Sequence, residues 1–169
     1  MNSRSPLSLL AFTLVALLVT HAAVARADQL VVYPVTGTAT EDRLADVEDA
    51  ISATLRASGH VVVNGHAIRT PATVVGVPQT SDQMVEVAAA NQATWVIVAD
   101  IAPLPGQYTL HLRVGYAPVR RVEELSVNVL EDEEAPRLAD VLRCLIRPEG
   151  LGEDAVRLSG GTPDDPDAQ

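Results

Sequence analysis

The strongest constraint on the fold is a regular alternation of apolar and polar residues over 107–116 and 122–130. In the first run the apolar members are Tyr108, Leu110, Leu112, Val114 and Tyr116, and in the second they are Leu125, Val127 and Val129. A period of two predicts strands that bury one face. A turn at 117–121 joins the two runs, so we expect an antiparallel meander here.

An Ala-rich helix is expected just upstream of the meander. Thr80 and Gln83 have the spacing of a capping box, which satisfies free backbone N–H groups where a helix begins. The helix leads into 94–99, the most apolar strand candidate, which we place at the centre of the sheet. Asp100 interrupts this strand, and a turn follows at 103–106.

The pattern in the first half of the domain predicts a strand, a helix and a second strand. The apolar run 29–35 is the first strand, and Thr38 and Glu41 form a capping box for an amphipathic helix of about 18 residues that ends near Gly59. The run 60–63 is apolar enough to lie inside a sheet. The segment 66–80 is expected to be a loop. A short edge strand at 73–77 within this loop is one interpretation of the sequence.

A last helix follows Pro136, a residue that suits the first helical turn. Its apolar stripe includes Cys144, the only cysteine, which we interpret as a buried inert thiol. The predicted order is β-α-β-α-β-β-β-α. We therefore expect an α/β (α+β) fold with a single mixed sheet of about five strands and helices packed on it.

The first 27 residues have the order of a secretory signal peptide. One basic residue, Arg4, precedes an uncharged apolar run at 7–19, and Ala25 and Ala27 supply the small-x-small cleavage pattern. The run is about 13 residues long, whereas a membrane span needs roughly 20. We expect cleavage before Asp28, a folded domain over 28–150 and a disordered acidic tail over 151–169.

Charge narrows the classes of partner. The chain has 22 acidic residues against 12 basic ones, all of them Arg, and its formal net charge is −10. Removal of Arg4 and Arg26 with the signal peptide would bring this to −12. Nucleic acids and anionic membranes need positive charge facing them, so both are disfavoured as partners.

The order of elements and three local sequences resemble the small α/β domain of the TolB N-terminal type, whose relatives include CsgG and LpoB. The three sequences are the strand with its Pro-containing end at 31–35, the Ala-rich helix and strand at 85–100, and the meander at 107–114 and 122–130. The likeness covers about residues 29–147. It implies an envelope protein that contacts other proteins, and it brings no catalytic residues. The TolB propeller and the lipidated cysteine of CsgG and LpoB are absent.

The sequence offers no convincing catalytic, cofactor or metal motif. His60 and His66 lack the regular spacing of a metal site, and the segment 36–40 lacks the Lys and the Gly-rich spacing of a phosphate loop. We therefore expect neither metal nor cofactor, and interpret 36–40 as a capping loop.

Five polar residues form the predicted interaction patch. Arg113, Arg120 and Arg121 are the one basic cluster, which either meets an acidic partner or offsets the adjacent acids of 123–124. His111 is expected to point outward from its strand. Asp100, at the end of an apolar strand, is interpreted as a residue of the sheet rim.

These features predict a non-catalytic, soluble, exported protein, periplasmic or secreted, that acts as an accessory or interaction module for envelope proteins. A sheet edge or the outer face of the meander would be the docking surface. The alternative is a small-ligand-binding or sensing domain that uses the loop 67–80 as a lid.

Overall fold

A mixed sheet of six strands organises residues 28–151, the part of the chain that the computed structural model describes. The order across the sheet is β3-β1-β4-β5-β6, and β2 pairs with β4 beyond the end of β1. The strands are β1 (Gln29–Val32), β2 (Thr36–Gly37), β3 (Val61–Asn64), β4 (Trp95–Leu104), β5 (Gln107–Tyr116) and β6 (Arg121–Leu130). Strands β1 to β4 pair in parallel and β4 to β6 antiparallel.

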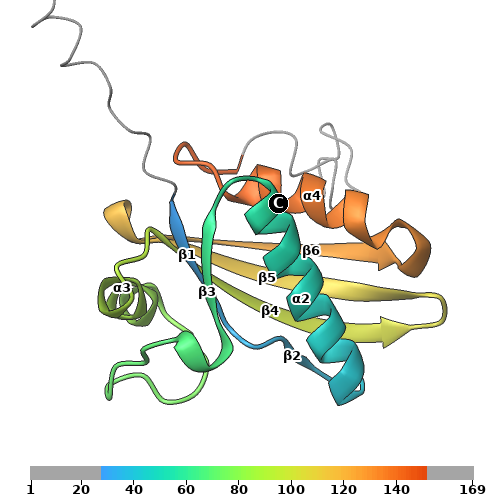
Figure 1. The fold of residues 1–169 in the computed structure, drawn as a ribbon, viewed down its shortest axis with the longest axis horizontal. Coiled ribbons are helices and arrows are strands. Elements are labelled where there is room, and N and C mark those ends of the chain that lie inside the picture. Colours follow the sequence, from blue (N-terminus) through green and yellow to red (C-terminus); the bar gives the residue numbers. More distant parts are fainter. Residues whose placement is uncertain (1–27, 152–169) are drawn as a thin grey trace, which may run out of the picture.

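Three helices pack on this sheet, as Figure 1 shows. They are α2 (Glu41–Ala57), α3 (Ser81–Ala90) and α4 (Glu134–Leu145). Helix α2 lies across the strands, α4 lies near β6, and α3 lies at the other end of the sheet. The predicted fold class is confirmed, and β4 is the central strand as expected.

One face of the sheet is buried along its whole length beneath α2 and α4. The alternating apolar residues of β4, β5 and β6 point into this core, where they meet Val47, Ile51 and Leu55 of α2. Leu138 and Val141 of α4 complete the contact. Burial of this many apolar side chains is the main stabilising contribution to the fold.

The second face is covered only at one end. Helix α3 lies there with Met84, Val87 and Ala88 packed on β1 and β4. Met84 sits so close to Gly115 of β5 that an added Cβ would lie 2.6 Å from its sulfur. The missing side chain of Gly115 therefore lets α3 approach the sheet.

Several local predictions need correction. Helix α2 is capped by Thr40, whose side chain accepts a hydrogen bond from the Arg43 N–H, and not by Thr38. The predicted capping box of α3 at Thr80 and Gln83 is confirmed. Thr36 and Gly37, expected in a loop, form β2.

Strand placement also differs from expectation in three places. Strand β3 lies at the edge of the sheet, where Val61 stays 49% exposed, and not inside it. No strand forms at 73–77. Strand β4 continues through Asp100 to Leu104, so Pro103 lies in the strand and the turn is confined to 105–106.

A half-buried ion pair joins the beginnings of α2 and α4. The Arg43 guanidinium donates to the Glu134 carboxylate at 2.6 Å and stacks over the Tyr108 ring. Burial acts to lower the pKa of Arg43, but Glu134 raises it above its usual value. Burial and the nearby Glu134 charge raise the pKa of Tyr108, whose buried hydroxyl makes no hydrogen bond with the described residues.

The predicted signal peptide at 1–27 lies outside the described residues, and so does nearly all of the predicted tail, 152–169. Within 28–151, no helix combines the length and apolar character needed to cross a membrane.

Replacing Gly37 with Ala tests the contact between β2 and β4. Gly37 has a φ of 139°, and an added Cβ would lie 2.0 Å from the Ile101 carbonyl oxygen. Because that oxygen belongs to the central strand and cannot retreat, we expect Gly37→Ala to lower the free energy of unfolding by about 3 kcal/mol. Urea unfolding followed by circular dichroism measures it.

The matched control is Gly76→Ala. Gly76 also has a positive φ, of 72°, but nothing lies within 4 Å of an added Cβ. Only backbone strain remains, so we expect Gly76→Ala to lower the free energy of unfolding by about 1 kcal/mol. Equal losses for the two variants would contradict the close approach of β2 to β4.

Replacing Tyr108 with Phe tests the buried hydroxyl. Because the folded-state pKa of Tyr108 is raised above its ordinary value of 10.0, the unfolded chain loses this proton first as the pH rises. The stability linked to Tyr108 is therefore complete below about pH 10 and declines above it. Tyr108→Phe should reduce the loss of stability above pH 10 without destabilising the protein at pH 7. Urea unfolding at pH 7 and at a pH above 10 measures both effects.

Tyr33→Phe is the control, because the Tyr33 hydroxyl is hydrogen-bonded to Thr70 at 3.3 Å. Its removal should cost about 1 kcal/mol at pH 7. A loss at pH 7 for Tyr108→Phe as large as that for Tyr33→Phe would show that the Tyr108 hydroxyl is bonded after all.

Candidate functional site

The register of β4, β5 and β6 sorts their side chains into rows on the sheet face opposite α2 and α4. From the end covered by α3 outward, the rows are Val98–Arg113–Glu124, Asp100–His111–Ser126, Ala102–Thr109–Asn128 and Leu104–Gln107–Leu130. Because α3 covers only the end of the sheet formed by the starts of β4 and β6 and the end of β5, the rows beyond it face outward. We call this surface the open face.

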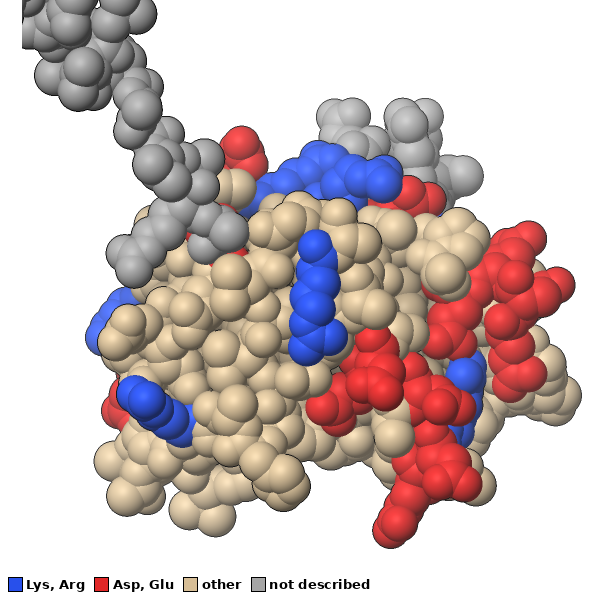
Figure 2. All heavy atoms as spheres, viewed as in Figure 1, with Lys and Arg blue, Asp and Glu red and all other residues tan. Residues whose placement is uncertain are grey.

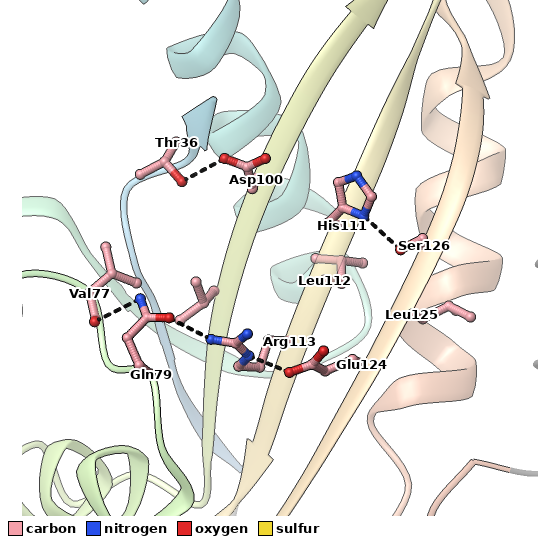
Figure 3. A pocket seen from close by; sticks show the side chains of 11 residues that line it. Thr36, Val77, Gln79, Asp100, His111, Leu112, Arg113, Glu124, Leu125 and Ser126 are labelled. Atoms are coloured by element: carbon pink, nitrogen blue, oxygen red, sulfur yellow. Dashed lines mark hydrogen bonds and ion pairs between the residues drawn. The ribbon is translucent and has the colours of Figure 1, made fainter. Parts of the chain in front are cut away.

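A pocket of about 300 Å³ lies on the open face, where the segment 77–79 runs beside the strands. Figure 3 shows its lining, which comes from β2, from this segment and from β4, β5 and β6. The segment approaches from the α3 side and leaves the pocket open toward solvent. The site is therefore a shallow hollow in a sheet surface.

Polar side chains on the open face are paired across neighbouring strands (Figure 3). The Thr36 hydroxyl donates to the Asp100 carboxylate at 3.0 Å, and His111 Nδ1 and the Ser126 hydroxyl lie 2.6 Å apart. Thr109 and Asn128 are bonded at 2.9 Å in the next row. These bonds hold the side chains in fixed positions on the surface.

Arg113 connects the strands to the segment above them. Its Nε donates to the Glu124 carboxylate at 2.6 Å, and its Nη1 donates to the Gln79 side-chain oxygen at 2.9 Å. Gln79 thus stays beside β5 through a charge-assisted bond. Because Glu124 is largely exposed, the ion pair itself contributes little to stability.

The structure brings three of the five predicted patch residues together and separates the other two. Asp100, His111 and Arg113 line the same pocket. Asp100 lies in the middle of β4, paired with His111 and beside Thr36, and not at the sheet rim. His111 points outward as predicted.

Arg120 and Arg121 belong to different surroundings. Arg120 has a left-handed φ of 54° and reaches Asp82 of α3 at 3.2 Å. Arg121 pairs with Glu123 at 2.9 Å and donates to the carbonyls of Arg147 and Pro148 after α4. The three arginines therefore form no single basic cluster, and two of them offset Glu123 and Glu124.

Among the polar lining residues, Thr36, Gln79 and Ser126 were missed by the sequence reasoning. Ser126 could have been found, because it alternates with Leu125 and Val127 and so shares the outward face with His111. Thr36 and Gln79 carried no such signal, because each reaches the site from a segment far away in the chain.

The row Asp100–His111–Ser126 has the residue types of a hydrolytic triad but not its connections. In a triad the carboxylate orients the imidazole. Here the Asp100 carboxylate accepts from Thr36, and the imidazole Nδ1 is bonded to Ser126. The His111–Ser126 pair therefore has no hydrogen bond to the Asp100 carboxylate that would orient the imidazole. In residues 28–151 no group of three or more His, Cys, Asp or Glu is arranged to hold a metal ion.

A second, more apolar hollow lies under the predicted lid. It measures about 280 Å³, and Tyr33, Ile68 and Thr70 are among its lining residues. It shares Thr36 and Val77 with the first pocket. The segment around Val77 therefore separates two neighbouring hollows.

The side of the molecule that carries α2 has a different character. Figure 2 shows carboxylates gathered over the first half of α2 and over the turn before α4. These include Glu41 and Asp42 and the exposed run 131–133. On the open face, in contrast, Arg113 and Glu124 pair with each other, and the Asp100 carboxylate is bonded to the Thr36 hydroxyl.

Comparison with known proteins gave matches among solved structures only. No family model matches the chain, and neither does any curated protein. The PelC dodecamer from Paraburkholderia phytofirmans is 18% identical, with 70% of this chain and 86% of that chain covered and a TM-score of 0.46. The LpoB C-terminal domain from Escherichia coli is 15% identical, with 70% and 94% covered and a TM-score of 0.48.

TolB from Acinetobacter baumannii also matches, at 12% identity with 68% of this chain and 25% of that chain covered and a TM-score of 0.43. LpoB and TolB are thus structural neighbours at low identity, in line with the resemblance seen in the sequence, while the likeness to CsgG stays a prediction.

Proposed function

We propose that this chain is an exported accessory protein of the cell envelope that acts by binding another protein through its open face. The proposal includes cleavage of the signal peptide before Asp28, a domain over 28–150 and a tail over 151–169. It places the protein in the periplasm or outside the cell, without a catalytic role.

The observation that carries the proposal is the composition of the open face. Leu104 and Leu130 are 44% and 45% exposed and flank Gln107 in the outermost row. The rows behind them hold hydrogen-bonded polar pairs around a shallow hollow. Exposed apolar side chains beside paired polar groups, without a run of like charge, are typical of a docking surface.

A second candidate is the binding of a small ligand beneath the segment 67–80. The two adjacent hollows of about 300 and 280 Å³ support it, because they share Thr36 and Val77. Movement of Val77 would join them into a space of the size that small ligands occupy. A ligand there would be enclosed only after the segment closes over it.

Site-specific photo-crosslinking in cells tests the proposed function. A photoreactive benzoyl-phenylalanine replaces Asn128 on the open face or, as the matched control, Asp49 on α2, and both native residues are exposed. We expect a discrete covalent product with one envelope protein from position 128 and none from position 49.

A product from position 49 alone, or from neither position, would contradict docking through the open face.

For the second candidate, the free pool of small molecules from the same cells is added to the purified protein. A rise in melting temperature that Val77→Trp abolishes would favour ligand binding.

A further inference from the structure

Strand β6 forms the outer edge of the sheet beside the open face. All ten of its residues pair with β5, one for one and without a bulge. Edge strands are normally protected from further pairing by Pro, Lys, a bulge or short length. The sequence of β6, RVEELSVNVL, has neither Pro nor Lys, and its charged residues, which also protect edges, lie only near its start, at 121, 123 and 124.

The direction of the backbone groups of β6 follows from two bonds at the ends of the meander. The Ala117 N–H donates to the Thr94 carbonyl at 3.0 Å, so odd-numbered residues of β5 bond to β4 and even-numbered ones to β6. The Glu131 N–H donates to the Gly106 carbonyl, so even-numbered residues of β5 bond to odd-numbered residues of β6.

The even-numbered residues of β6 therefore direct their N–H and C=O groups away from the sheet. These are Val122, Glu124, Ser126, Asn128 and Leu130. Among the described residues, no backbone hydrogen bond outside the helices and strands reaches them. At the start of the strand, the Leu151 N–H donates to the Glu123 side chain, whereas from residue 124 onward no backbone group of residues 28–151 bonds to this edge.

The surroundings of this edge determine what it can bind. On the helix side the neighbours are apolar, namely Leu125, Val127 and Val129. On the open-face side Glu124 is paired with Arg113, so the negative charge beside the edge comes from the three exposed acids at 131–133 that follow the strand. The charge of Arg121 is offset by Glu123. A complementary strand has apolar residues on one side and basic residues on the other.

We propose that the β6 edge, from Glu124 to Leu130, binds an extended partner segment of alternating apolar and basic residues as an additional strand. Backbone bonds to the even-numbered residues would give affinity, and the two rows of side chains would give specificity. The inference rests on the proposed function and names the kind of segment that the partner presents.

The test uses the full exported chain and a capped nonapeptide of alternating Val and Arg. Its control is the same peptide N-methylated at every residue, which keeps the charge but removes the N–H donors from both backbone edges and so cannot pair as a strand. Binding is measured by fluorescence anisotropy at about 150 mM salt, which screens unspecific attraction of the basic peptide to the acidic protein. We expect binding of the unmodified peptide and at least about tenfold weaker binding of the methylated one.

Two variants at Ser126 locate the contact. Ser126→Pro removes an outward N–H and places a ring in the path of the added strand. The backbone bonds to β5 stay intact because the Ser126 backbone does not make them, and only the side-chain bond to His111 is lost. Ser126→Ala keeps the N–H and is the control. Because both variants lose the hydroxyl that is bonded to His111, their difference reports the N–H alone. We expect about tenfold weaker peptide binding for S126P than for S126A, with circular dichroism verifying that both fold.

Amide exchange by NMR gives an independent readout. In the free protein the amides of Glu124, Ser126 and Asn128 should exchange faster than those of Leu125, Val127 and Val129, and the peptide should slow only the first set. Equal binding by S126P, or by the methylated peptide, would overturn the proposal. Slow exchange of the even-numbered amides without peptide would overturn it too, because the edge would then be covered by the chain or a second copy.

The outcome is separable from that of the proposed function. If position 128 crosslinks to a partner but the β6 edge binds no peptide, docking through the open face would stand. Only the proposal of an added strand would then be ruled out.

Discussion

The structure depends on the unbroken register of β4, β5 and β6. Each of these strands has ten residues, and the pairing runs without a bulge from one end of the meander to the other. Because side chains alternate between faces, one register fixes the whole distribution of apolar and polar residues. A slip by one residue would turn the buried leucines and valines outward, so burial under α2 and α4 and the layout of the open face have the same origin.

The two faces then acquire different roles. The helix side buries the main core and is tied together at the beginnings of α2 and α4 by Arg43 and Glu134. Its exterior is strongly acidic (Figure 2). The opposite face is half covered by α3, because Gly115 admits Met84. What residues 28–151 leave uncovered is a small surface with the Arg113–Glu124 ion pair, two exposed leucines and the adjoining β6 edge.

The sequence predicted the features that periodicity controls. Alternation located the meander, helical periodicity located α2 and α4, and apolar continuity identified β4 as the central strand. These patterns report which faces are buried. They do not report neighbours within a sheet, so the valines of β3 were placed inside although β3 lies at the edge.

The candidate site was predicted in part for the same reason. His111 and Arg113 follow from alternation along β5, and Asp100 from its position in an apolar run. The separation of Arg120 and Arg121 from Arg113 depends on the left-handed turn at Arg120, which reverses the chain between β5 and β6. The contacts of Thr36 and Gln79 depend on tertiary packing, which no local pattern encodes.

Hydroxyl-radical footprinting tests the central claim, that the open face is the functional surface, most directly. It compares side-chain oxidation in the purified exported protein with that in the same protein within an envelope extract. The account predicts protection of Leu104, His111 and Leu130 in the extract, with Val61 and Val119, exposed elsewhere on the molecule, oxidised equally in both. Protection of Val61 or Val119 while Leu104 and Leu130 remain reactive would contradict it.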